Sequence, residues 1–219
     1  MRRFLIPALG VAAAGVLAAC TGVDHPGACY ESGATPYPVH APGDTSVVFH
    51  WPNTFQPVRY WVEPVGNLTA HVDNGLHLWV NAFRCGELAL QFWADSASAD
   101  VIIRNPSQLP ATQGATTLAA DSVNACRGRT DIFLDSLGRM VRPLHSWVVP
   151  SSPDSAAVEA CYQFVTAHEI GHTLGLLSHS SDPADLMYAV PRHTVLSVND
   201  RYTIQALYHF AAPTQPVPR

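Results

Sequence analysis

The sequence predicts a single α+β domain, and three observations support this. Its 219 residues suffice for one ordinary domain, and 47% of them are hydrophobic, which is enough apolar surface to build a core. Apolar residues recur with helical spacing in some segments and alternate as in a strand in others. The formal net charge of −5 is too small for an intrinsically disordered chain.

Five segments have the composition or the alternation of β-strands. They are residues 46–49, 58–62, 88–93, 101–104 and 130–134. In the third segment, Leu88, Leu90 and Phe92 alternate with their neighbours, so one face of that strand is expected to be buried.

Three helices are expected. The first ends near Gly86 and carries apolar residues on one face: Leu76, Trp79, Val80 and Phe83. The second spans 152–174, with Ser-Pro-Asp as its start signal and Gly175 as its stop. The third begins at Ser197, and Asp200 three residues later makes an approximate capping box with it.

The first twenty residues have the layout of an export signal. Two arginines precede an apolar run, 4–19, that is too short for a comfortable transmembrane span. The run closes as Leu-Ala-Ala-Cys at 17–20, which resembles the lipobox of bacterial lipoproteins, where the cysteine is acylated. We therefore expect a signal peptide over 1–19 and an outer-membrane or cell-surface lipid anchor at Cys20. The alternative is an ordinary cleaved signal in which Cys20 has no role.

The rest of the chain divides by composition. Residues 20–44 are rich in Gly and Pro and are expected to form a tether or a short pro-segment. A folded domain follows over 45–212, and 213–219 is expected to be a disordered tail. All 12 basic residues are arginine, against 17 acidic ones, and this acidic excess argues against a nucleic-acid-binding surface.

Four cysteines remain once Cys20 is set aside: Cys29, Cys85, Cys126 and Cys161. An even number in an exported chain predicts two disulfides. The spacing leaves all three connectivities open. Because Cys161 lies on the second predicted helix, a disulfide there would brace that helix.

His168, Glu169, Ile170, Gly171 and His172 form an HExxH pattern on the second predicted helix. Residues four apart lie on one helix face about 6 Å from each other, so the two imidazoles can bind one metal ion. Glu169 is rotated by about 100° from His168 and can reach a water molecule at that metal. The pattern favours a zinc-dependent hydrolase over a helix that carries two histidines for structural reasons.

The residues that follow extend this motif. Gly175 allows the chain to leave the helix in a left-handed conformation, and His179 comes next as a third candidate ligand. Farther on stands Asp-Leu-Met-Tyr at 185–188. Together these residues resemble the metzincin metallopeptidases, and most closely the matrixin branch. The order of helices and strands over 45–210 is also similar to that of matrixin catalytic domains.

The resemblance implies a twisted, mostly parallel sheet with a backing helix, an active-site helix and a small helical C-terminal lobe. It implies a zinc endopeptidase with one catalytic Zn²⁺ held by His168, His172 and His179. Glu169 would be the general base, and Met187 an apolar floor beneath the metal. An extended protein or peptide substrate would lie along the edge strand of the sheet. The alternative is a non-catalytic surface lipoprotein that keeps this fold as a binding module.

The third ligand departs from the family pattern. In metzincins it stands at the position of Ser178, whereas His179 lies one residue later. We expect the loop to absorb the extra residue, with Asp182 or Asp185 as substitutes.

Further metal sites and the substrate cleft are open to weaker interpretations. Because Gly114–Leu134 contains no histidine, the structural zinc of matrixins is not expected. Asp131 and Asp135 are either calcium ligands or ordinary surface carboxylates. The segment Phe83–Gly86 faintly resembles a cysteine switch, with a disulfide at Cys85 as the simpler alternative. Two sets of residues are candidates to line the cleft, namely His145 with His193, and Ala189-Val190-Pro191 as a small apolar wall.

Overall fold

The computed structural model describes residue 29 and residues 34–111, 116–117, 121–123, 125–209 and 214–217. The expected signal peptide and Cys20 lie outside these residues. Seven strands form one sheet: β1 (Val58–Val62), β2 (Leu90–Phe92), β3 (Val101–Arg104), β4 (Thr116–Thr117), β5 (Asp121–Val123), β6 (Cys126–Leu134) and β7 (Met140–Pro150). The order is β2-β1-β3-β7-β6-β4, with β5 also paired to β6.

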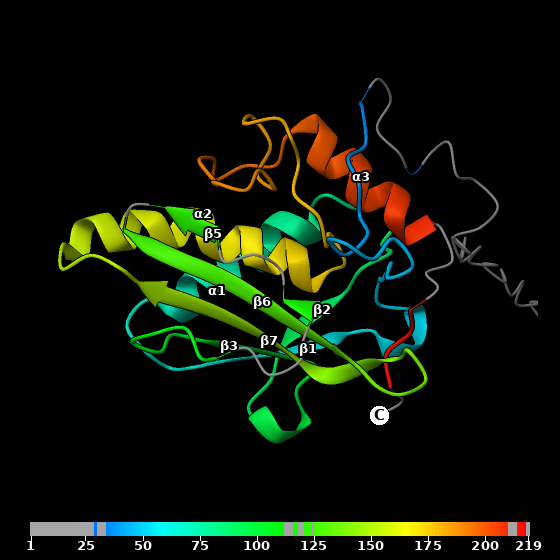
Figure 1. The fold of residues 1–219 in the computed structure, drawn as a ribbon, viewed down its shortest axis with the longest axis horizontal. Helices are drawn as coiled ribbons and strands as arrows, with labels where there is room; N and C mark the ends of the chain where they lie inside the picture. Colours follow the sequence, from blue (N-terminus) through cyan, green and yellow to red (C-terminus); the bar gives the residue numbers. More distant parts are fainter. Residues whose placement is uncertain are drawn as a thin grey trace, which may run out of the picture.

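The sheet is parallel on one side and antiparallel on the other. Strands β2, β1, β3 and β7 run parallel, whereas β6 is antiparallel to β7, and β4 and β5 are antiparallel to β6. Helix α2 (Ser155–Thr173) lies between the sheet and helix α3 (Val198–His209), and helix α1 (Leu68–Val80) packs against α2 (Figure 1). The predicted α+β fold is confirmed.

Two of the helix starts follow the sequence signals closely. At α2 the Asp154 carboxylate accepts hydrogen bonds from the amides of Ala156 and Ala157, so the aspartate rather than Ser152 is the cap. At α3 the capping box is reciprocal, because Asp200 N–H donates to the Ser197 hydroxyl and Ser197 N–H donates to the Asp200 carboxylate.

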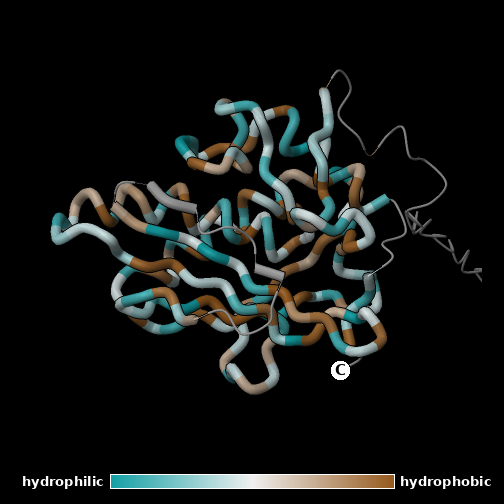
Figure 2. Tube along the Cα trace, in the orientation of Figure 1, coloured by the Kyte–Doolittle hydropathy of each residue, from teal (hydrophilic) through white to brown (hydrophobic). Residues whose placement is uncertain are grey.

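The hydrophobic core joins α1 to α2 at close range. Hydrophobic residues, brown in Figure 2, recur along both strands and helices, and the buried ones form one cluster that includes residues of α1 and α2. Trp79 of α1 is fully buried and donates its indole N–H to the carbonyl of Ala167 at 2.8 Å. A Cβ atom at Gly171 would lie 2.7 Å from the Trp79 ring and 2.5 Å from Met187 Sδ. This glycine between the two motif histidines therefore gives both side chains the room to reach α2.

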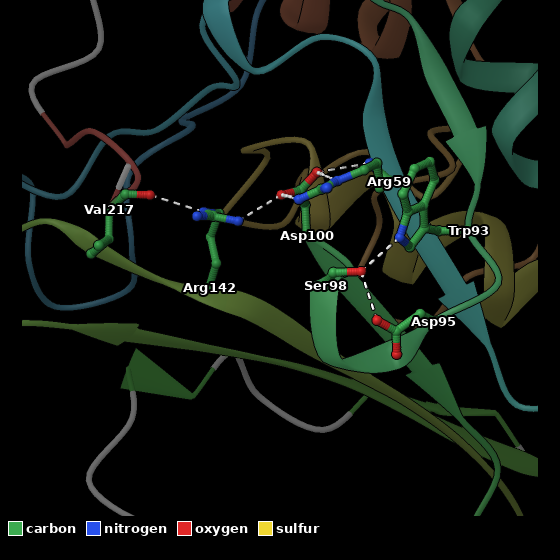
Figure 3. A network of polar contacts seen from close by, with 7 residues as sticks. All are labelled: Arg59, Trp93, Asp95, Ser98, Asp100, Arg142 and Val217. Carbon is green, nitrogen blue, oxygen red and sulfur yellow. Dashed lines mark hydrogen bonds and ion pairs between the residues drawn. The ribbon is translucent and has the colours of Figure 1, made fainter. Parts of the chain in front are cut away.

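A buried charge network joins the sheet to the C-terminal segment (Figure 3). Asp100 is fully buried and accepts hydrogen bonds from Arg59 Nε at 3.1 Å and from Arg142 Nη1 at 2.8 Å. Arg142 also donates to the carbonyl of Val217. Two guanidinium groups offset the desolvation of this one carboxylate, so β1, the start of β3 and β7 are held in register.

Two disulfides are present, as the cysteine count predicts, and the structure decides their connectivity. Cys29 pairs with Cys85, and Cys126 pairs with Cys161. The second bond ties the start of β6 to α2, the helix that carries the motif. The bond between Cys29 and Cys85 excludes the cysteine-switch interpretation of Cys85, because that role needs a free thiol.

Three expectations from the sequence are corrected. The strand expected at 46–49 is wrong, since of those residues only Phe49 makes an isolated bridge, to Thr214. Strand β7 was not foreseen, and β6 begins before the predicted segment at 130–134. The disordered tail does not extend over 214–217, because Met140 exchanges backbone hydrogen bonds with this segment.

The expected tether also contributes to the folded domain. Within 34–44, Tyr37 is buried and donates its hydroxyl to Asp200 at 2.9 Å. The carbonyl of Val39 accepts from the amide of Leu177. These contacts place residues 34–44 against α3 and the loop that follows α2, so the folded domain begins before residue 45.

The disulfide at α2 yields a stability prediction. Replacing both Cys126 and Cys161 with serine opens a link across 35 residues and should lower the free energy of unfolding by about 3 kcal/mol, chiefly because the unfolded chain gains conformational freedom. Urea denaturation followed by tryptophan fluorescence measures the change. The double serine variant of Cys29 and Cys85 opens a longer link, of 56 residues, and should lower the free energy of unfolding at least as much, because loop entropy grows with loop length. An unchanged unfolding midpoint in the first variant contradicts the prediction.

Candidate active site

Two of the predicted ligands lie on the buried face of α2. His168 and His172 are both fully buried, and their ring centroids are 4.7 Å apart at an interplanar angle of 84°. One helical turn separates them, so both rings face the same side of the helix, as the motif requires.

The chain then reverses direction, and this brings a third imidazole close to the first two. Gly175 has a φ of +111°, and a Cβ atom there would lie 1.9 Å from the carbonyl oxygen of Phe49. No other residue type fits this position without rearrangement. The His179 ring lies 5.3 Å from that of His168 and 5.1 Å from that of His172, measured between centroids.

The expectation that the loop absorbs the extra residue is therefore confirmed. Ligand atoms of His168, His172 and His179 all lie within 4.8 Å of one another. The two proposed substitutes are engaged elsewhere, since Asp185 accepts from the Ser180 hydroxyl at 2.5 Å and Asp182 accepts from the Ala184 amide.

The histidine rings are oriented by backbone carbonyls. His168 Nδ1 lies 2.8 Å from the carbonyl oxygen of Leu186, and His172 Nδ1 contacts that of Leu176. Because a carbonyl can only accept, both Nδ1 atoms carry the hydrogen and Nε2 is left to bind a metal. Three imidazoles at this spacing are the donor set that a catalytic zinc ion takes in proteins.

Asp200 holds the turn that contains Met187. Met187 is fully buried, with its sulfur against Gly171 between the two motif histidines. The Asp200 carboxylate accepts from the amides of Leu186 and Met187, at 2.7 and 3.3 Å. The sequence indicates Asp200 only as part of a helix cap, because its contacts with Leu186 and Met187 are not evident from spacing.

Glu169 points from α2 toward β6. It is 1% exposed, and its Oε2 accepts a hydrogen bond of 2.6 Å from the Thr130 hydroxyl. A Cβ atom at Gly128 would lie 2.1 Å from Glu169 Oε1. No motif or spacing in the sequence indicates that Gly128 or Thr130 contacts Glu169.

The candidate calcium ligands bind arginines instead. Asp131 is paired with Arg129 at 2.9 Å, and Asp135 with Arg139 at 2.8 Å. Hydrogen bonds from Arg139 lower the pKa of the Asp135 carboxyl below its usual range. An adjacent guanidinium opposes a divalent cation electrostatically, so these two carboxylates do not fit a calcium site.

The two histidines expected to line the cleft, His145 and His193, lie in different parts of the structure. His145 stands opposite Asp131 in the β6–β7 pairing and stacks on Trp147, on the sheet face away from Thr130 and the zinc ligands, since successive side chains alternate. Burial lowers the pKa of His145. His193 is exposed in the loop before α3.

The outer edge of β6 is already paired. Strand β5 pairs with residues 126–128, and β4 pairs with residues 131–132. Along these residues the sheet edge is formed by β4 and β5 rather than by β6. An extended peptide that adds to the sheet along residues 126–128 or 131–132 has to pair with these strands or replace them.

Comparison with known families decides the assignment. The family model described as Matrixin matches residues 87–209, which is more than half of the chain and includes all three histidines. The chain belongs to the matrixin family. No curated protein matches it at a significant level.

The matrixin assignment and the histidine triad together fix the activity. The protein is a zinc metalloendopeptidase that acts on protein substrates, and the triad of His168, His172 and His179 is consistent with its catalytic zinc site. Its two disulfides agree with an extracellular location.

The third ligand yields a metal-binding prediction. His179→Ala should lower zinc affinity by about 100-fold or more, because two imidazoles alone leave the metal exposed to competing water. Competition with a zinc-responsive chelating dye measures this. Asp182→Asn is the matched control and should bind zinc as the unaltered protein does. The reverse outcome, with the asparagine variant losing the metal and the alanine variant keeping it, assigns the ligand to Asp182.

Proposed function

We propose that Glu169 is the general base of peptide-bond hydrolysis in this matrixin. The observation that carries the proposal is the Glu169 carboxylate, which is buried one residue from His168 and accepts a hydrogen bond from Thr130 of β6. A carboxylate in this place can take a proton from a water molecule and deliver it to the departing amine. When zinc is bound, it supplies Lewis-acid chemistry that polarises the water and the scissile carbonyl.

The proton balance needs only this one carboxylate. Water supplies the oxygen that bonds to the carbonyl carbon, Glu169 receives one proton from it, and the C–N bond breaks as the amine receives that proton. The carboxylate returns to its starting state, so the same residue serves as base and then as acid.

We propose two supporting roles near the metal. Met187 forms an apolar floor, which is supported by its complete burial and by its sulfur against Gly171. The segment 189–191 forms a small apolar wall and favours a hydrophobic side chain after the scissile bond. Its Val190 is 37% exposed, so it is accessible to a substrate.

We also propose that the protein is an outer-membrane or cell-surface lipoprotein anchored through an acylated Cys20. The lipobox-like Leu-Ala-Ala-Cys at 17–20 supports this proposal. Within the described residues, none of the helices has the length and apolar character needed to span a bilayer. Acyl chains on one residue would then place the peptidase at a membrane surface.

Glu169→Gln tests the general-base role. The variant should retain one zinc per chain but lose activity on casein by a factor of about 10² to 10⁴, because the ligands remain while the proton acceptor is gone. Activity of the unaltered protein should disappear with a zinc chelator and return when zinc is added. Normal turnover by the glutamine variant rules out Glu169 as the base. A zinc-loaded, unaltered protein without activity on any protein substrate instead supports the binding-module alternative.

Cys20→Ser tests the anchor. In a bacterial host that processes lipoproteins, the full chain should incorporate a labelled fatty acid and sediment with membranes, and the serine variant should do neither, because it lacks the thiol that is acylated. Thr21→Ser is the matched control and should behave as the unaltered protein. Fatty-acid labelling that persists in the Cys20→Ser variant contradicts acylation at this residue.

A further inference from the structure

The contact between Thr130 and Glu169 joins two segments 39 residues apart. Thr130 lies on β6 and is fully buried, and its side chain faces α2. Its hydroxyl lies 2.6 Å from Glu169 Oε2, 3.4 Å from the Glu169 carbonyl oxygen and 3.2 Å from the Ser146 hydroxyl. The shortest of these three contacts is the one to the carboxylate.

The chemistry of the groups sets the direction of this hydrogen bond. A hydroxyl carries one hydrogen, and an ionised carboxylate can only accept, so Thr130 donates to Glu169. The Ser146 hydroxyl on β7 is then in position to donate to Thr130 Oγ1. The two buried hydroxyls thus form a short chain of hydrogen bonds, from Ser146 to Thr130 and from Thr130 to the Glu169 carboxylate. The last of these bonds is charge-assisted.

Gly128 leaves the space in which the carboxylate lies. A Cβ atom there would be 2.1 Å from Glu169 Oε1, 2.7 Å from Glu169 Cδ and 2.6 Å from Val165 Cγ1. Any side chain at this position would displace the carboxylate from β6. Gly128 and Thr130 point to the same face of the strand because they are two residues apart.

We propose that Thr130 is a positioning residue that holds the Glu169 carboxylate in its reactive orientation. A glutamate side chain has several rotatable bonds, and a carboxylate already fixed in the free enzyme avoids ordering them during the reaction. The disulfide between Cys126 and Cys161 ties β6 to α2 on the N-terminal side of both residues, so the two elements that make this contact are covalently linked. This inference rests on the proposed role of Glu169 as general base.

Three variants test the proposal. Thr130→Val removes the hydroxyl and keeps the shape, Thr130→Ser keeps the hydroxyl, and Thr166→Val is the matched control. Thr166 is 1% exposed on α2, and its hydroxyl makes no hydrogen bond to another described residue. The zinc-loaded full-length variants are compared for kcat and KM on an internally quenched peptide, and for zinc content.

Thr130→Val should lower kcat by about tenfold or more, since misplacement of a catalytic group by about 1 Å can cost about 100-fold. KM should change by less than about twofold, because Thr130 is fully buried. Zinc content should stay at one per chain. Thr130→Ser should keep most of the kcat of the unaltered protein. Thr166→Val should leave kcat, KM and zinc content unchanged.

Other outcomes overturn the proposal. If Thr130→Val has a normal kcat, or if the valine and serine variants lose activity equally, the hydroxyl does not position the base. If Thr130→Val loses zinc, its role is structural. The variant Glu169→Gln separates the two proposals. If Glu169→Gln is fully active, Glu169 is not the general base. If Glu169→Gln is inactive but Thr130→Val has normal activity, only the positioning role of Thr130 is refuted.

Discussion

The active site depends on the chain reversing direction immediately after α2. Two imidazoles on one helix cannot enclose a metal, and the third has to come from residues beyond the helix. Gly175 permits this, because its left-handed φ of +111° and its contact with the Phe49 carbonyl leave no room for a side chain. From there His179 returns to the rings of His168 and His172, although it lies one residue beyond the usual family position.

A single buried carboxylate organises the other side of the site. Asp200 is fully buried and accepts hydrogen bonds from the amides of Leu186 and Met187 and from the Tyr37 hydroxyl. The carbonyl of Leu186 in turn orients His168. Four hydrogen-bond donors, including the Ser197 amide, place partial positive charges around this carboxylate and stabilise it. The arrangement connects the segment near residue 37 with the turn that contains Met187.

Local signals predicted local structure well. The spacing of the HExxH motif, the stop at Gly175 and the capping box of α3 each depend on contacts within a few residues, and each is confirmed. Prediction failed where pairing across the sheet decides the outcome. The segment at 46–49 has strand composition but makes only an isolated bridge, at Phe49. Strand β7 forms because β3 and β6 pair with its two edges.

The sequence by itself determined the zinc chemistry, since the ligand types, their helical spacing and the glycine that ends the helix are all local properties. Only the tertiary structure decided the cysteine pairing, the contact between Thr130 and Glu169, and which strand forms the sheet edge at the site. The physical reason is distance along the chain. Cys126 and Cys161 are 35 residues apart and Thr130 and Glu169 are 39 apart, so these contacts exist only once β6 has docked beneath α2.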